Sequence, residues 1–192
     1  MESSKSCWKC KNKIDFNSFL CGKCNTVQQL FDLNPYDIFS LEKKFDIDND
    51  LLEDKYLELQ NILHPDKFIN YSEKERSLSN AHSSNINNAY EKLNNNVSRV
   101  KLLLSINGYD TAEDDRSFKD TSMLEEIMEL QNKCMSIQND SEFEKLKSQL
   151  ELKIEDEKKK ITTFFNQKNF EEAHKTSIKL SYLEKIKDNL VK

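Results

Sequence analysis

Four cysteines near the N-terminus have the spacing of a metal site. Cys7 and Cys10 form one C-x2-C pair, and Cys21 and Cys24 form a second pair after ten intervening residues. Two such pairs let four thiolates surround one tetrahedral ion, and Zn²⁺ suits a closed site of four sulfurs. The protein would then supply every ligand, which leaves no coordination position for catalysis. The pattern therefore predicts a structural Zn²⁺ site.

The same cysteines would also serve two disulfides, a redox dithiol or a rubredoxin-like iron site. The N-terminal sequence shows no secretory hydrophobic segment, and a reducing compartment disfavours disulfides. Residues 1–30, which we call the hook, are few, so a bound metal would supply most of their folding energy. Gly22 is expected to give the second pair the backbone freedom that its turn needs. Whether the hook only folds around its metal or also offers a contact or dimer surface is left open.

A second candidate site is the tripeptide His64-Pro65-Asp66, which we call the HPD tripeptide. A proline pushes the preceding residue out of helical conformation, so His64 should leave a helix and Asp66 should follow in a turn. An imidazole and a carboxylate on a rigid proline turn form a preorganised contact that costs little ordering entropy on binding. Taken alone the tripeptide is weak evidence, because a proline that merely ends a helix can give the same sequence.

The flanking sequence predicts two antiparallel helices joined by this turn. Asp48 can cap the first helix, which has apolar residues at helical spacing as far as Leu63. His82 is expected to pack against the helices of residues 33–107. A short aromatic helix is expected within 34–45, and the string SRVKLLLSINGYD follows the pair. The second helical pattern runs through His82, Ile86, Ala89, Tyr90 and Leu93.

The C-terminal half, from Phe118, reads as three amphipathic helices, which predicts a small three-helix bundle. Asn169 can cap the third helix, with Glu172 three residues further on. A coiled-coil dimer competes for the middle helix, but its heptad pattern is not sustained. We expect Cys134 to be a small core residue and His174 to lie on a solvated face.

The composition limits the fold and the partners. The chain has 192 residues with two glycines and two prolines, which favours helices over a turn-rich sheet. The formal net charge of −5 argues against a general nucleic-acid binder. No apolar run approaches the roughly 18 residues of a membrane-spanning helix, so no membrane partner is expected.

The order of the predicted elements resembles the J domain of DnaJ-type co-chaperones, over residues 33–110. In J domains the HPD loop contacts the ATPase domain of a DnaK-type chaperone and promotes ATP hydrolysis. The resemblance thus implies chaperone binding by the HPD tripeptide, together with Lys55 and Lys67. J domains usually carry several basic residues on the preceding helix, whereas this one offers mainly Lys55 and has Asn61 where a basic residue is common. Steering toward the partner should therefore be weaker and less sensitive to salt.

The hook, the J domain and a bundle at 115–192 together resemble the HscB family of iron-sulfur cluster co-chaperones, in its metal-bearing eukaryotic form. The strings CWKC, LHPDKF, AHSSNINNAYEKL, MLEEIMEL, NFEEAHK and KLSYLEKI carry the resemblance. In that family the bundle holds the scaffold protein on which clusters are built, and the matching positions here are Leu124, Met128, Glu129 and Tyr182. Glu125 departs from the family, which often has a large apolar residue there. Its charge would weaken the scaffold contact or match a basic residue on the scaffold, and both remain open.

The predicted fold is therefore all-α, with a zinc-knuckle hook, a J-domain helical hairpin and a C-terminal three-helix bundle. The resemblance implies a co-chaperone, not an enzyme, that recruits an iron-sulfur scaffold protein to a DnaK-type chaperone and stimulates its ATPase. A general J protein for unfolded clients is the alternative. The family points to the mitochondrial matrix and a cytosolic pool, although no transit signal is evident in the sequence, and a weak homodimer is left open.

Overall fold

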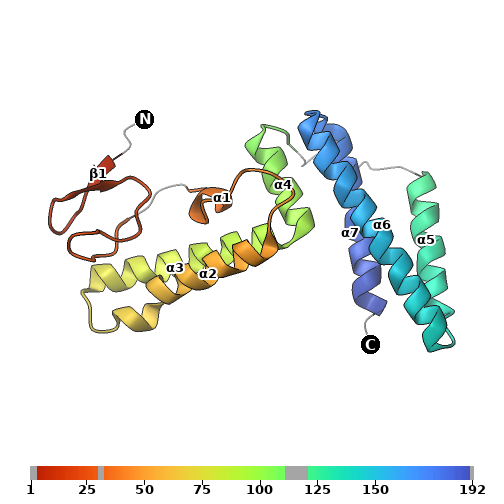
Figure 1. The fold of residues 1–192 in the computed structure, drawn as a ribbon, viewed down its shortest axis with the longest axis horizontal. Helices are drawn as coiled ribbons and strands as arrows, with labels where there is room; N and C mark the ends of the chain where they lie inside the picture. The colour runs from red at the N-terminus through yellow and green to blue at the C-terminus, as the bar shows by residue number, and fades with distance from the viewer. Residues whose placement is uncertain (1–3, 30–32, 111–120, 191–192) are drawn as a thin grey trace. The chain divides into compact units, whose positions relative to one another are not determined.

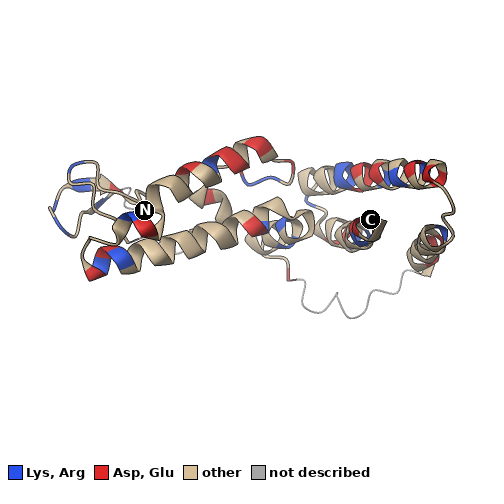
Figure 2. Ribbon diagram, turned by 90° about the horizontal axis from the view of Figure 1, so that it is seen from below, with Lys and Arg blue, Asp and Glu red and all other residues tan. Residues whose placement is uncertain are grey.

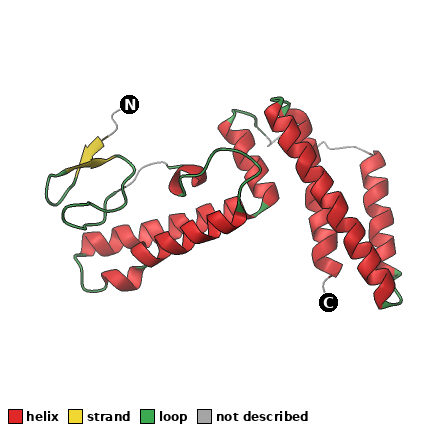
Figure 3. Ribbon diagram, viewed as in Figure 1, coloured by secondary structure: helices red, strands yellow, loops and turns green. Residues whose placement is uncertain are grey.

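The computed structural model describes residues 4–29, 33–110 and 121–190. These residues confirm the helical fold, and short strands occur only in the hook among them (Figure 3). The chain divides into two compact units, one of Met1–Glu42 with Ile47–Asn94 and one of Lys43–Asp46 with Asn95–Lys192. Within the described ranges, no helix is both long and apolar enough to cross a membrane.

The hook is built from two similar turns beside a small antiparallel ribbon. Strands β1 (Ser4–Ser6) and β2 (Lys13–Asp15) pair so that Lys5 lies opposite Ile14. Among residues 4–29 of the hook, positive φ occurs at Lys11, at 62°, and at Asn25, at 52°, each four positions after the first cysteine of its pair.

The expectation for Gly22 is wrong. Its φ lies outside the left-handed region, and an added Cβ would meet no atom within 4 Å. The strained position in each turn instead follows the second cysteine, and in the second turn it is filled by Asn25. Asparagine tolerates the left-handed conformation better than most residues do, so no glycine is needed there.

The helices of the first unit form the expected hairpin. Helix α1 (Pro35–Ile38) is followed by α2 (Asn49–Leu63), the 3-10 turn η1 (Pro65–Phe68) and α3 (Glu73–Asn94). As expected, Asp48 caps α2 by accepting a hydrogen bond of 3.1 Å from the Leu51 amide. Tyr56 of α2 stacks on Tyr90 of α3, with ring centroids 4.2 Å apart. Figure 1 shows the two helices side by side, with the hook near the first turns of α3.

The second unit contains α4 (Asn96–Ile106), α5 (Thr121–Met135), α6 (Asp140–Asn166) and α7 (Phe170–Leu190). Residues 115–120, where the bundle and its first helix were expected to begin, lie outside the described residues. Asn169 caps α7 as expected, accepting from the Glu172 amide at 3.3 Å. Cys134 is half-buried against the bundle core. The buried residues of that core are Met123, Ile127, Leu130, Leu146, Leu150, Leu183, Ile186 and Leu190.

Helix α7 buries a second face in addition to the one that packs into the bundle core. Its residues Ala173, His174 and Ser177 are fully buried, and the His174 ring lies 6.1 Å from that of Tyr109. The expectation that His174 is a solvated surface residue is therefore wrong. The physical reason is α4, which packs against α7 and covers a face that an isolated three-helix bundle would leave to water.

Ion pairs fasten α5 to both neighbouring helices. The Glu126 carboxylate pairs with Lys153 of α6 and with Lys179 of α7, the latter at 2.7 Å. Lys179 also lies 3.3 Å from the largely buried Glu157 of α6. Hydrogen bonds from Lys153 and Lys179 lower the pKa of Glu126, outweighing the opposite effect of burial. The network thus fixes which face of α5 turns toward the bundle.

Candidate metal centre and interaction surfaces

The four cysteine sulfurs of the hook converge on one point. Cys7 Sγ lies 3.6 Å from Cys24 Sγ, Cys10 Sγ lies 3.7 Å from Cys21 Sγ, and all four lie within 4.8 Å of one another. Four thiolates at about 2.3 Å from one tetrahedral ion would stand about 3.8 Å apart. A disulfide needs about 2.0 Å, and the cysteines are free thiols. The geometry fits a four-sulfur metal site and does not fit two disulfides.

The electrostatics of the cluster also fit a cation. Burial raises the pKa of the Cys7 thiol, but hydrogen bonds from the Cys10 and Lys9 backbone and from neighbouring thiols outweigh it and lower the pKa. At Cys10 the hydrogen bond from the Asn12 backbone lowers the pKa, but burial and the other thiols raise it overall. A bound cation would stabilise the thiolate form of the cysteines that hold it.

The HPD tripeptide lies on an exposed turn whose backbone is fixed. His64 has φ −58° and ψ 132°, which is the extended conformation expected before a proline. Its Nδ1 accepts a hydrogen bond of 3.3 Å from the Asp66 amide and lies 3.6 Å from Asp66 Oδ2. Both side chains are otherwise open to solvent, with Asp66 80% exposed. An imidazole and a carboxylate thus lie together on the exposed surface of this turn.

The two lysines expected beside the tripeptide have different surroundings. Lys67 Nζ donates a hydrogen bond of 2.8 Å to Asn61 Oδ1, at the position where J domains often carry a basic residue. Lys55 Nζ donates to the Phe39 carbonyl at 2.7 Å and to the Ser40 carbonyl at 3.3 Å, so it also holds the end of α1. The other charges of α2 are acidic, as the red segments in Figure 2 show; they are Asp50, Glu53, Asp54 and Glu58.

The residues expected to bind a scaffold protein lie on α5 and α7. Leu124 is 40% exposed and Met128 is 62% exposed, although both are large apolar residues. Glu129 is exposed and pairs with Lys133 at 2.7 Å. Tyr182 is half-buried against the bundle core, with the Lys185 amine 5.8 Å from its ring centroid. The two apolar side chains are therefore free to contact a partner, and Tyr182 is partly free.

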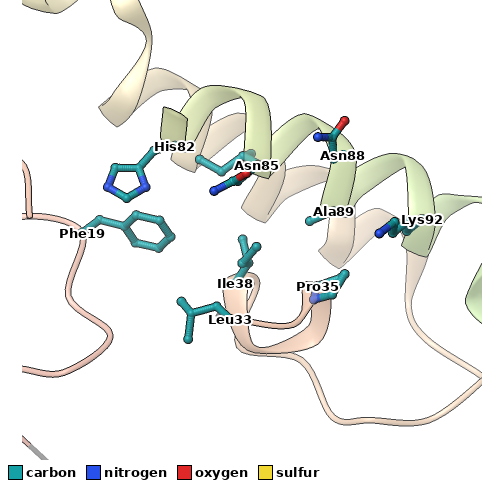
Figure 4. Close-up of a pocket in the computed structure, with 10 residues that line it drawn as sticks. Phe19, Leu33, Pro35, Ile38, His82, Asn85, Asn88, Ala89 and Lys92 are labelled. Carbon is teal, nitrogen blue, oxygen red and sulfur yellow. The ribbon is translucent and has the colours of Figure 1, made fainter. Parts of the chain in front are cut away.

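His82 is buried on α3, beside the groove that α1 also lines, and it faces the hook as well. Its Nε2 lies 2.7 Å from the Gln28 carbonyl, and its ring meets that of Phe19 edge to face at 5.3 Å. Figure 4 shows these two rings at one end of a groove of about 310 Å³, with Ile38 of α1 and Asn85 of α3 along its walls. Burial lowers the pKa of His82, which favours the neutral ring.

Comparison with known proteins identifies the family. A family model described as the HSCB C-terminal oligomerisation domain matches residues 119–191. The Arabidopsis thaliana "Iron-sulfur cluster co-chaperone protein HscB homolog" is 30% identical over 192 residues, covering 100% of this chain and 75% of its own length. The chain belongs to the HscB family. The mouse iron-sulfur cluster co-chaperone HscB is 27% identical over 188 residues, covering 96% of this chain and 80% of its own.

A solved HscB structure has the same fold. The crystal structure of the human co-chaperone protein HscB superposes with a TM-score of 0.83 and 26% identity, over 97% of this chain and 96% of the human one. The plant and mouse relatives are named as iron-sulfur cluster co-chaperones. Membership therefore places the chain among the iron-sulfur cluster co-chaperones.

One exposed residue of the HscB bundle was missed by the sequence reasoning. Met135 is 85% exposed, and it lies seven positions after Met128 and eleven after Leu124. At 100° per residue these three side chains share one narrow face of α5. The signal was present in the spacing i, i+4, i+11 of large apolar residues. We call Leu124, Met128 and Met135 the α5 stripe.

Proposed function

We propose that this HscB-family protein binds an iron-sulfur scaffold protein, presents it to a DnaK-type chaperone and stimulates the ATPase of that chaperone. The observation that carries the proposal is the HPD tripeptide, exposed on a turn whose conformation is already set. The α5 stripe supports a second, separate surface, because large apolar side chains are exposed there in a row. Linking two binding sites in one chain raises the effective concentration of the second encounter.

On the chaperone side, the proposal assigns the contact to His64 and Asp66, with Pro65 holding the turn. Proline fixes its own φ and restricts the residue before it, so little backbone entropy is lost when the partner binds. Lys67 stands near enough to Asn61 to supply one positive charge beside the turn. Lys55 is assigned a smaller part, because its amine already holds two carbonyls.

On the scaffold side, the proposal assigns the contact to the α5 stripe, Glu129 and Tyr182. Aromatic anchors with a half-buried ring often dominate the energy of an interface. Tyr182 has such a ring, and the core behind it keeps the ring in place. Burying the exposed part of the α5 stripe would add the hydrophobic gain.

For the hook, we propose Zn²⁺ as a structural ion held by Cys7, Cys10, Cys21 and Cys24. When bound it would supply a positive centre that joins the two turns, with no open position for a substrate. Elemental analysis of the purified protein should give about one zinc per chain. A stoichiometric iron content with the colour of a ferric thiolate site would contradict this assignment.

We also propose the mitochondrial matrix as the main compartment, with a cytosolic pool, on the strength of the family resemblance. Fractionation of cells with an antibody against the native protein would test this placement. A signal confined to the secretory pathway would contradict it.

The decisive experiment is the ATPase rate of a DnaK-type chaperone with this protein, with and without an iron-sulfur scaffold protein. His64→Gln should abolish stimulation in both conditions, whereas the loop variant Asn70→Ala should behave as wild type. Tyr182→Ala should leave the scaffold-free stimulation unchanged and remove most of the added effect of the scaffold. Leu152→Ala, an exposed apolar change on α6, is the matched control for Tyr182→Ala.

Two outcomes would contradict the proposal. If stimulation needs His64 but the scaffold adds nothing, the protein is a general J protein for unfolded clients. If wild-type protein does not stimulate the chaperone at all, the HPD tripeptide has no role in ATPase activation.

A further inference from the structure

The first cysteine pair of the hook reaches across to the first turn of α3. Trp8 and Lys9 are the two residues between Cys7 and Cys10. Lys9 Nζ lies 3.4 Å from Glu75 Oε1. Lys74 Nζ lies 4.3 Å from the centroid of the Trp8 ring, while the indole Nε1 donates a hydrogen bond of 2.7 Å to the Val27 carbonyl.

Glu75 is the buried residue that this contact stabilises. It is only 3% exposed, and burying a carboxylate is costly unless it is paired and hydrogen-bonded. Its Oε2 accepts from the Ser72 amide at 3.3 Å and the Ser72 hydroxyl at 2.6 Å, and Ser72 Oγ accepts in turn from the Glu75 amide. This reciprocal capping begins α3. Lys9 supplies the counter-charge for the buried acid.

The first two turns of α3 hold both ends of the segment that carries the HPD tripeptide. Ser72 ends that segment and is bonded to Glu75. Ser79, one helical turn after Glu75, donates a hydrogen bond of 2.7 Å to the carbonyl of Leu63, the last residue of α2. Residues 64–72, which we call the HPD loop, are thus anchored through α3 at each end.

A second contact also leads back to a metal ligand. The Gln28 side chain donates a hydrogen bond of 3.3 Å to Cys7 Sγ, and the Gln28 carbonyl lies 2.7 Å from His82 Nε2 on α3. Phe19 adds its ring to His82 from the same side (Figure 4). The hook therefore contacts α3 at two points about two turns apart, and both points adjoin the sulfur cluster.

We propose that the metal-filled hook braces the start of α3 and thereby positions the HPD loop, with Trp8 and Lys9 as the positioning residues. The metal sets the conformation of the first cysteine pair, which sets where Trp8 and Lys9 stand. Loss of the metal would then loosen the α3 start as well as unfold the hook. The coupling itself needs no partner protein; only its effect on a chaperone rests on the proposed function.

Coupling between two sites is reciprocal, so weakening the α3 contact must weaken metal binding by the same factor. Zn²⁺ affinity, measured by chelator competition, should fall about fivefold to tenfold in Lys9→Met and in Glu75→Gln, which lies outside the hook. Lys23→Met is the matched control, because Lys23 holds the same position in the second cysteine pair and is exposed. Its Zn²⁺ affinity should equal that of wild type.

Two further readouts follow the contact without any chaperone. Trp8 is the single tryptophan, so its emission should shift to the red when Zn²⁺ is removed and the ring leaves Lys74. Amide hydrogen exchange in residues 72–79 should speed up at least tenfold on Zn²⁺ removal, whereas residues 96–106 of α4 should be unchanged.

Equal Zn²⁺ affinities in all three variants, with unchanged exchange at the α3 start, would overturn the proposal and leave the hook an independent element. If these binding results hold but zinc-loaded protein does not stimulate a chaperone, the proposed function fails while the brace stands. If zinc-free Cys10→Ser protein stimulates as wild type does, the brace does not reach the HPD loop.

Discussion

Met135 shows how a single side chain can separate stability from binding. It is the most exposed of the large apolar residues among the described part of the chain, at the end of the α5 stripe. A side chain that contacts so little of its own protein contributes little to folding. Its apolar surface would be buried only against a partner, where methionine adapts its shape well.

We therefore predict that Met135→Ser weakens binding to the scaffold protein about threefold to tenfold, which corresponds to roughly 1 kcal/mol of lost apolar burial. The melting temperature should change by less than about 1 °C. Leu152→Ser is the control, because Leu152 is similarly exposed but lies on α6. Calorimetric titration of each variant with the scaffold would decide; equal loss in both would remove Met135 from the interface.

At the scale of the element, α5 depends on charges to keep its orientation. Glu126 lies about opposite the α5 stripe on the helix, and it pairs with lysines from both α6 and α7. The lowered pKa of Glu126 means that the folded protein stabilises the ionised carboxylate more than the unfolded chain does. The contribution is present above the unfolded pKa of about 4.3 and is lost as pH falls below it through the folded value.

Glu126→Gln should lower the free energy of unfolding by about 1 kcal/mol at pH 7, because two lysines lose their shared partner. The difference between wild type and variant should shrink toward zero as pH falls below about 4. Thermal melts of the two proteins across pH 3 to 7 would measure it. A difference that stays constant over this range would show that the carboxylate charge is not what matters.

The elements with a local cause were predictable from the sequence. The Asp48 cap, the proline that releases His64 from α2 and the Asn169 cap each act within a few residues, and each is observed. The convergence of four cysteines was equally readable, because C-x2-C spacing constrains the backbone directly.

The contacts that could not be predicted involve partners that are distant in sequence. The sequence of α7 alone placed His174 on a solvated face. The side chain is buried because α4, about 70 residues earlier in the chain, covers it. The contact of His82 with the Gln28 carbonyl was likewise not predictable, because Gln28 lies in the hook. No periodicity within one helix reports which other helix or loop will cover an extra face.

At the scale of the whole molecule, the charge distribution sets how the protein meets a chaperone. The net charge is −5, and α2 carries four carboxylates against one lysine. Long-range electrostatic attraction needs an excess of charge of one sign near the binding residues. Dissolved salt screens this attraction at distances beyond about 10 Å. Such an excess of positive charge is lacking on the helix that precedes the HPD loop.

We predict that ATPase stimulation falls less than about threefold between 50 and 300 mM KCl, since little of the encounter rate depends on attraction between charges. A variant with Asp54→Lys and Glu58→Lys should stimulate more strongly at low salt and lose that advantage at high salt. Steady-state ATPase assays at several concentrations of the protein would measure both. A steep loss in the wild type would mean that other basic residues steer the encounter.

The packing of α4 on α7 determines where the protein can be cut for study in pieces. A fragment limited to residues 119–191, the range of the family match, would leave Ser177 and His174 in water together with the rest of the α7 face that α4 covers. Such a fragment should be poorly soluble and quickly proteolysed. A fragment that begins at Asn95 keeps this face covered, so we expect this fragment to survive purification.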